Sequence, residues 1–153
     1  MKLADRVAFD VIGRPQQKGS KRPFMTRRKG GGVDVHVRDD NPNAKPWALA
    51  VAAEAAAAHN GAELIRGPVA VTMLFYFKRP KGHYGTGRNA DRVRASAPWH
   101  MITTPDLDKL ARCAIDALSG TVIGDDAQIM ELRANKRYGD PERVEITIEE
   151  AAT

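Results

Sequence analysis

The segment Val69–Phe77 constrains the fold more than any other part of the sequence. It reads Val-Ala-Val-Thr-Met-Leu-Phe-Tyr-Phe, so that both sets of alternating positions are largely apolar. A strand of this kind is covered on both faces, which places it at the centre of a sheet. Its length suits a strand and falls well short of the roughly 20 apolar residues that span a bilayer.

Alternating and helical patterns predict the elements around this strand. We expect further strands at Val7–Ile12, Val33–Arg38, Ala127–Arg137 and Arg143–Glu149. Helices are expected from Pro46 to His59 and from Asp108 to Leu118. Gly13–Gly32 is interpreted as a long basic loop, and Lys81–His100 as an irregular surface insertion. The fold class is therefore α+β, a small mixed sheet packed against two main helices in one domain over residues 1–153.

Composition narrows the class of protein further. The first ten residues, MKLADRVAFD, carry an aspartate where a signal peptide needs an apolar segment, so we expect a cytoplasmic protein without a membrane partner. Cys113 is the one cysteine of the chain, which excludes an internal disulfide and a cysteine-based zinc site. It lies among apolar residues at helical spacing and is expected in the core. Gly85–Ala90 has the glycine spacing of a dinucleotide-binding loop but lacks the strand and helix around it, so no nucleotide cofactor is expected.

Basic residues gather in two segments that are also rich in glycine, proline or serine. The chain has 24 lysines and arginines against 19 acidic residues. One cluster extends from Arg14 to Lys29 and the other from Lys78 to Arg94. Two such segments on a small domain favour a polyanionic partner over two merely solvated loops. The residues predicted to contact such a partner are Arg14, Lys18, Lys21, Arg22, Lys78, Arg79, Lys81, Arg88 and Lys109.

The carboxylates that suggest chemistry lie in Thr104-Pro-Asp-Leu-Asp-Lys-Leu-Ala-Arg112. In an extended segment, Asp106 and Asp108 share one face, and Asp108 suits a helix N-cap. A helix of about 15 Å followed by an extended Thr121–Asp126 would bring Asp125 or Asp126 back to Asp108. The alternative is that these residues are a turn, a cap and a loop without catalytic function.

Clustered carboxylates repel one another, and a hard divalent cation removes that repulsion. Oxygen ligands of this kind favour Mg²⁺, with Mn²⁺ as a substitute, over zinc. Such an ion leaves positions open for phosphate oxygens and activates water. The predicted metal ligands are therefore Asp106 and Asp108, together with Asp125 or Asp126.

These motifs resemble those of the RusA-like Holliday junction resolvases of bacteriophages and prophages. The resemblance is carried by Pro105–Arg112, Asp116-Ala-Leu118, Gly120 and Asp125-Asp-Ala-Gln128, with Gly13-Arg-Pro15 and Arg79-Pro-Lys81 as further matches. It implies a homodimer that uses Mg²⁺ to cut four-way DNA junctions by paired symmetric nicks. By matching positions, the resemblance implies that Asp106, Asp108 and Asp126 are the metal-binding and catalytic aspartates, with Asp125 as a further contributor. A twofold dimer would also suit the approximate twofold symmetry of a junction.

Two positions depart from the family pattern, since Lys109 replaces an asparagine and Arg112 replaces a lysine. Arginine stays protonated, so Arg112 is assigned to stabilising charge in the transition state and not to acting as a base. These departures motivate one alternative, a non-catalytic DNA-binding protein of the same fold. A second alternative is a less selective nuclease acting on flaps, forks or replication intermediates.

Overall fold

The computed structural model describes residues 6–151, except for the side chains of Lys21, Arg38 and Asp39. Its elements are, in chain order, β1 (Arg6–Ile12), β2 (Lys21–Arg27), β3 (Val33–Asp39), α1 (Ala44–His59), β4 (Val69–Phe77), the short 3₁₀ turns η1 (Lys81–His83) and η2 (Gly87–Asn89), α2 (Leu107–Leu118), η3 (Asp126–Gln128), β5 (Ile129–Tyr138) and β6 (Arg143–Glu150). The expected α+β class and mixed sheet are confirmed.

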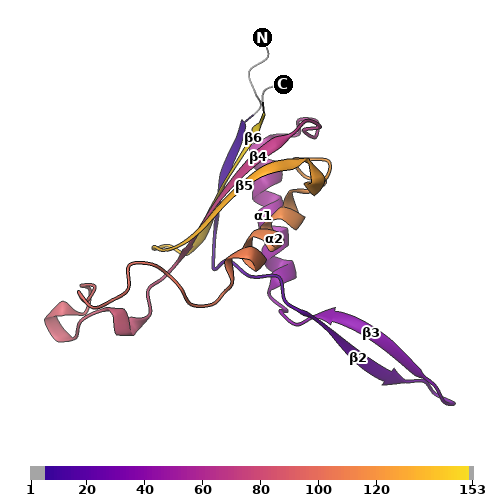
Figure 1. Ribbon diagram of the computed structural model, residues 1–153, viewed down its shortest axis with the longest axis horizontal. Helices are drawn as coiled ribbons and strands as arrows, with labels where there is room; N and C mark the ends of the chain where they lie inside the picture. The colour runs from indigo at the N-terminus through magenta and orange to yellow at the C-terminus, as the bar shows by residue number, and fades with distance from the viewer. Residues whose placement is uncertain (1–5, 152–153) are drawn as a thin grey trace, which may run out of the picture.

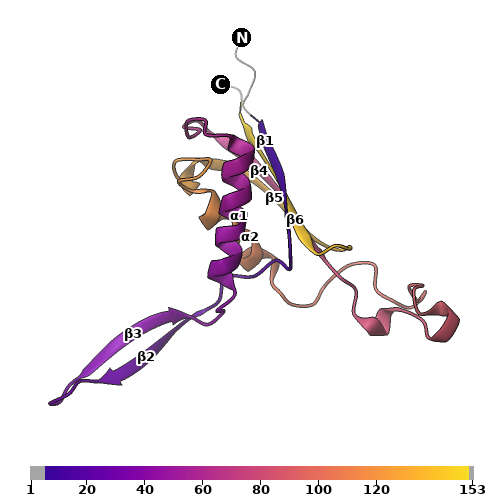
Figure 2. The ribbon, with the colours of Figure 1, turned by 180° about the vertical axis from the view of Figure 1, so that it is seen from behind.

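Four strands form the body of the molecule in the order β1-β6-β4-β5. β5 runs parallel to β4, whereas the β1–β6 and β4–β6 pairs are antiparallel. β4 is therefore flanked on both sides, as its sequence predicts. Both helices pack on the same face of this sheet (Figures 1 and 2). The β4 residues that face the helices are fully buried, and those of the opposite face are half-buried.

The two helices meet each other and the sheet through small and apolar side chains. Trp47 of α1 is 6% exposed, and Cys113 of α2 is buried with its Sγ 3.6 Å from the carbonyl oxygen of Ala44. Both residues are core residues, as expected. α1 ends at His59 and is capped by Asn60, which adopts a left-handed conformation and donates its N–H to the carbonyl of Ala56.

The expected basic loop Gly13–Gly32 is in part a strand. Residues 21–27 form β2, which pairs with β3 in an antiparallel hairpin that projects from the body (Figure 1). Pro23 and the basic side chains hide the strand signal, but a two-stranded ribbon tolerates proline because each strand has an unpaired edge. Gly30, Gly31 and Gly32 have positive φ angles and turn the chain at the tip. We call residues 20–40 the hairpin arm.

The expected insertion at Lys81–His100 is confirmed as irregular chain with two short 3₁₀ turns. It also projects from the body, away from the hairpin arm (Figure 1). A bridge between Tyr84 and Val93, and a bond from Arg94 Nε to the Tyr84 carbonyl oxygen at 2.6 Å, hold its two strands of chain together. We call residues 78–105 the basic insertion. Among the described residues, no helix has the length and apolar character to cross a membrane.

Candidate active site

Asp106 and Asp108 lie exposed at the start of α2. The helix begins one residue earlier than expected, so that Asp106 is its N-cap and Asp108 lies in its first turn. Helix boundaries often shift by a residue or two, and either aspartate suits the N-cap position. Leu107 packs partly against the core, as expected for the residue between them. The Asp106 carboxylate lies 3.3 Å from Lys109 Nζ.

The segment that precedes α2 is fixed by side chains from two other elements. Lys136 of β5 donates from Nζ to the carbonyl oxygens of Thr103 at 2.6 Å and Pro105 at 2.9 Å. Gln17 accepts the Asp106 N–H through Oε1 at 2.8 Å. These bonds position Asp106 on backbone that is held from both sides, which a catalytic group needs for fixed geometry.

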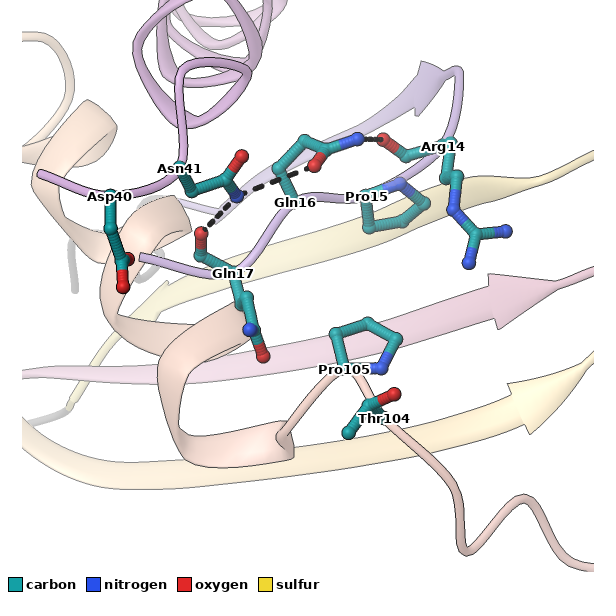
Figure 3. A pocket seen from close by; sticks show the side chains of 8 residues that line it. All are labelled: Arg14, Pro15, Gln16, Gln17, Asp40, Asn41, Thr104 and Pro105. Atoms are coloured by element: carbon teal, nitrogen blue, oxygen red, sulfur yellow. Dashed lines mark hydrogen bonds between the residues drawn. The ribbon is translucent and has the colours of Figure 1, made fainter. Parts of the chain in front are cut away.

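A polar cleft of about 400 Å³ lies beside this segment, between residues 14–17, 40–41 and 104–105 (Figure 3). Asn41 organises one wall, because its Nδ2 donates to the Gln17 carbonyl at 2.7 Å and to Gln16 Oε1 at 3.4 Å. Arg14 lines the cleft, but its guanidinium forms an ion pair with the Glu142 carboxylate at 2.7 Å. The cleft therefore joins the base of the hairpin arm to the start of α2.

Asp125 and Asp126 form a second carboxylate group. Asp125 caps η3, accepting the Ala127 N–H at 2.8 Å, while its own N–H bonds to Gln128 Oε1. The Ala127 N–H, followed by a hydrogen bond with Asp126, lowers the pKa of Asp125. The hydrogen bond with Asp125 raises the pKa of Asp126, and desolvation and the charges of Asp125 and Asp116 add to this.

Gln128 is a positioning residue to which the sequence interpretation gave no role. Its Nε2 donates to the carbonyl oxygens of Ile65 at 2.8 Å and Gly67 at 2.9 Å, and its Oε1 accepts from Asp125. It therefore fixes the second carboxylate group to the chain that leads into β4. Its place in the Asp-Asp-x-Gln motif is the signal that could have identified it.

The extended path expected for residues 121–126 is wrong, while the return of Asp126 to Asp108 stays a prediction. Residues 119–123 turn tightly, with three N–H groups of 121–123 bonding to the Leu118 carbonyl, and Val122 and Ile123 are fully buried. The helix carboxylate whose charge reaches Asp126 is Asp116, in the last turn. Strand β5 returns to the start of α2, where its Lys136 reaches Pro105.

The described residues contain no group of three aspartate, glutamate, histidine or cysteine side chains placed to hold one ion. Asp106, Asp108 and Asp126 therefore stay the predicted ligand set, although they do not form one group within the described part of a single chain. Between the two groups, α2 presents an exposed polar stripe. Arg112 lies one turn after Asp108 and one turn before Asp116, which pairs with Lys18 at 2.7 Å.

The predicted DNA contacts differ in how free they are to bind phosphate. Arg22 pairs with Asp40 at 3.0 Å, and Lys78 lies 3.8 Å from Asp140. Arg79 is structural, since it donates to the Pro98 carbonyl and stacks over the Tyr138 ring. Lys81 and Arg88 have no ion pair within the described part of the chain and are exposed. The side chain of Lys21 lies outside the described residues.

Comparison with known proteins identifies the class. A family model described as Endodeoxyribonuclease RusA matches residues 14–149. The chain therefore belongs to the RusA family of endodeoxyribonucleases, and the resemblance of its motifs to that family is confirmed. A relative of similar length is the uncharacterized protein YqaN of Bacillus subtilis (strain 168), which is 29% identical over 148 residues, covering 97% of this chain and 99% of the relative.

Proposed function

We propose that this chain is a homodimeric, divalent-metal-dependent endonuclease that resolves four-way DNA junctions by paired symmetric nicks. The observation that carries the proposal is the placement of Asp106 and Asp108. They are exposed at the start of α2, on backbone held by Lys136 and Gln17, within the region matched by the family. The two basic projections that flank the body supply the charge to hold DNA backbone.

The carboxylates fit a hard divalent cation in their chemistry. Asp106 already attracts an ammonium group, and the raised pKa of Asp126 reflects a carboxylate neighbour whose repulsion a cation would relieve. Asp106, Asp108 and Asp126, with Asp125, would hold Mg²⁺, or Mn²⁺ in its place. When bound, such an ion polarises the phosphodiester and activates the attacking water. Because the described residues of one chain do not group these carboxylates around a single ion, the second subunit of the dimer would complete the set.

The side chains along α2 suit the remaining tasks. Arg112 is permanently charged and exposed beside Asp108, so it stabilises the negative charge that develops on the scissile phosphate. Lys109 is close enough to Asp106 to exchange that partner for a DNA phosphate. Arg14 and Lys18 lie between the hairpin arm and α2, where they contact the DNA backbone beside the cleft. None of these contacts reads base sequence.

The test is cleavage of a labelled four-way junction with and without Mg²⁺. Paired symmetric nicks that need the metal are expected, and linear duplex of the same length should remain intact. Asp106→Asn, Asp108→Asn and Asp126→Asn should each abolish cleavage while junction binding persists. Full cleavage by all three variants would overturn the site. Binding without any metal-dependent nicking by the unaltered protein would instead identify a non-catalytic DNA-binding protein.

A further inference from the structure

Two large apolar side chains are exposed on the basic insertion, in the segment of chain that leads to the proposed catalytic aspartates. Trp99 is 83% exposed and Ile102 is 87% exposed, the highest values among the large hydrophobic residues that the structure describes. The other tryptophan, Trp47, is buried. Exposing an indole to water is unfavourable, so the exposed Trp99 side chain calls for an explanation such as a binding partner.

Hydrogen bonds from side chains to the surrounding backbone fix the segment that carries these two exposed residues. Arg79 donates to the Pro98 carbonyl at 2.8 Å, and Lys136 donates to the Thr103 carbonyl at 2.6 Å. Between these two anchors, Met101 is 8% exposed and packs into the core. The segment is thus fastened on both sides of Trp99 and Ile102, and a ligand that binds them meets side chains on preorganised backbone.

The charge of the chain around Trp99 and Ile102 favours a nucleic-acid partner over a protein partner. Residues 78–105 contain one acidic side chain, Asp91, against the basic residues Lys78, Arg79, Lys81, Arg88, Arg92 and Arg94. A second copy docked here across a twofold axis would bring two such basic segments together, whereas the cores of protein interfaces are poor in charge. A planar base with its attached phosphates matches both these apolar side chains and the cations around them.

We propose that Trp99 stacks on a base that is unstacked at the branch point of DNA, with Ile102 as a wedge beside it. The proposal rests on the proposed function, because it assigns the selectivity of the same site for branched DNA. Intact duplex offers no free base face, whereas the centre of a junction does once its strands are splayed. Trp99 precedes Asp106 by seven residues, so the length of chain places the stacked base within about 25 Å of Asp106.

The experiment measures binding in EDTA to a four-way junction with 2-aminopurine at the branch nucleotide. A second junction carries the probe within one arm, and a linear duplex carries it at its centre. The variants are Trp99→Ala, Trp99→Phe and Ile102→Ala, with Leu49→Ala as the matched control, since Leu49 is 63% exposed on α1. Tryptophan emission of the unaltered protein minus that of Trp99→Ala isolates the Trp99 signal.

We expect quenching of the branch-point probe and of Trp99 emission on the junction alone. Trp99→Ala should weaken junction binding roughly 5- to 150-fold, the contribution of one stacked base, and change duplex binding by less than about 2-fold. Trp99→Phe should recover most of the loss, and Leu49→Ala should bind like the unaltered protein.

Three results would overturn the proposal. They are unchanged junction binding by Trp99→Ala, an equal loss on junction and duplex, and no response of the branch-point probe to the unaltered protein. Sedimentation of the same variants adds a fourth, because a dimer that dissociates on Trp99→Ala would place Trp99 at a protein interface. Failure of the proposed function looks different, since a protein that stacks at the branch but never nicks DNA retains the stacking result.

Discussion

The backbone N–H of Asp40 donates to the carbonyl oxygen of Ser20 at 3.1 Å and closes the base of the hairpin arm. The two ends of the arm are therefore adjacent, although 19 residues separate them in the sequence. The arm lies outside the core, since no described side chain within residues 20–40 is buried. It can be removed at this point without cutting into the body.

Replacing residues 21–39 with a short Gly-Ser linker should leave the melting temperature within about 2 °C of the original, because no core contact is lost. DNA affinity should fall more than about tenfold at low salt, and the slope of log K against log salt should become shallower by roughly two to four units. Titrations at several salt concentrations measure both. The matched control keeps the arm and changes Arg27, Arg28 and Lys29 to Gln. An unchanged slope in both proteins would show that the arm does not contact phosphate.

Mixing chains that carry Asp106→Asn with chains that carry Asp126→Asn should restore cleavage. Each variant alone is expected to be inactive, but a mixed dimer holds one complete set when Asp106 of one subunit acts with Asp126 of the partner subunit. Random mixing would then give about a quarter of the original nicking rate, as single nicks and not paired cuts. Mixed chains without activity would show that each site is assembled within one subunit through movement of residues 119–128.

Asp125→Asn should lower the pKa of Asp126 in the metal-free protein. The hydrogen bond with Asp125 is the largest cause that raises it, followed by desolvation and then by the charge of Asp125, and the substitution removes that charge. A carboxyl whose pKa is raised in the folded state favours folding at low pH, and that contribution is lost as pH rises through the folded pKa. Titration of the side-chain carboxyl carbons by NMR measures the shift, with Glu63→Gln as a distant control. A pKa of Asp126 that stays raised would contradict the assigned cause.

Gln128→Ala should lower the free energy of unfolding by about 1–3 kcal/mol, because the carbonyls of Ile65 and Gly67 each lose their side-chain donor. Cleavage should also fall, since Asp125 loses the Gln128 partner of its N–H. Urea unfolding and the junction assay measure the two effects. Met130→Ala, at an exposed neighbouring position, should change neither by a comparable amount. A stable but equally inactive Gln128→Ala protein would indicate a direct part in chemistry.

Patterns of strong periodicity predicted the body of the fold correctly. β4 was delimited at Val69–Phe77, and Cys113 and Trp47 were assigned to the core. These features follow from burial, which the local sequence records directly. β2 was missed because Pro23 and its basic neighbours disguise a strand that exists only by pairing with β3.

The carboxylate residues could be selected from the sequence, but their arrangement could not. The extended path expected for Thr121–Asp126 assumes a segment without tertiary contacts. Val122 and Ile123 are an apolar pair that inserts into the core, and this tertiary contact bends the chain at Gly120. Reach along a chain sets only an upper limit on distance, and burial decides how much of it is used.

Helix α2 connects the Asp106–Asp108 pair to the Asp125–Asp126 pair along the chain. It responds to ionic strength differently from the projections that capture DNA. A helix of 12 residues is a rod of about 18 Å, stiffened by backbone hydrogen bonds that ionic strength does not weaken. The hold of the basic projections on phosphate, by contrast, weakens as salt rises. Ionic strength should therefore govern how often DNA is captured, while the position of the cut within a captured junction stays constant.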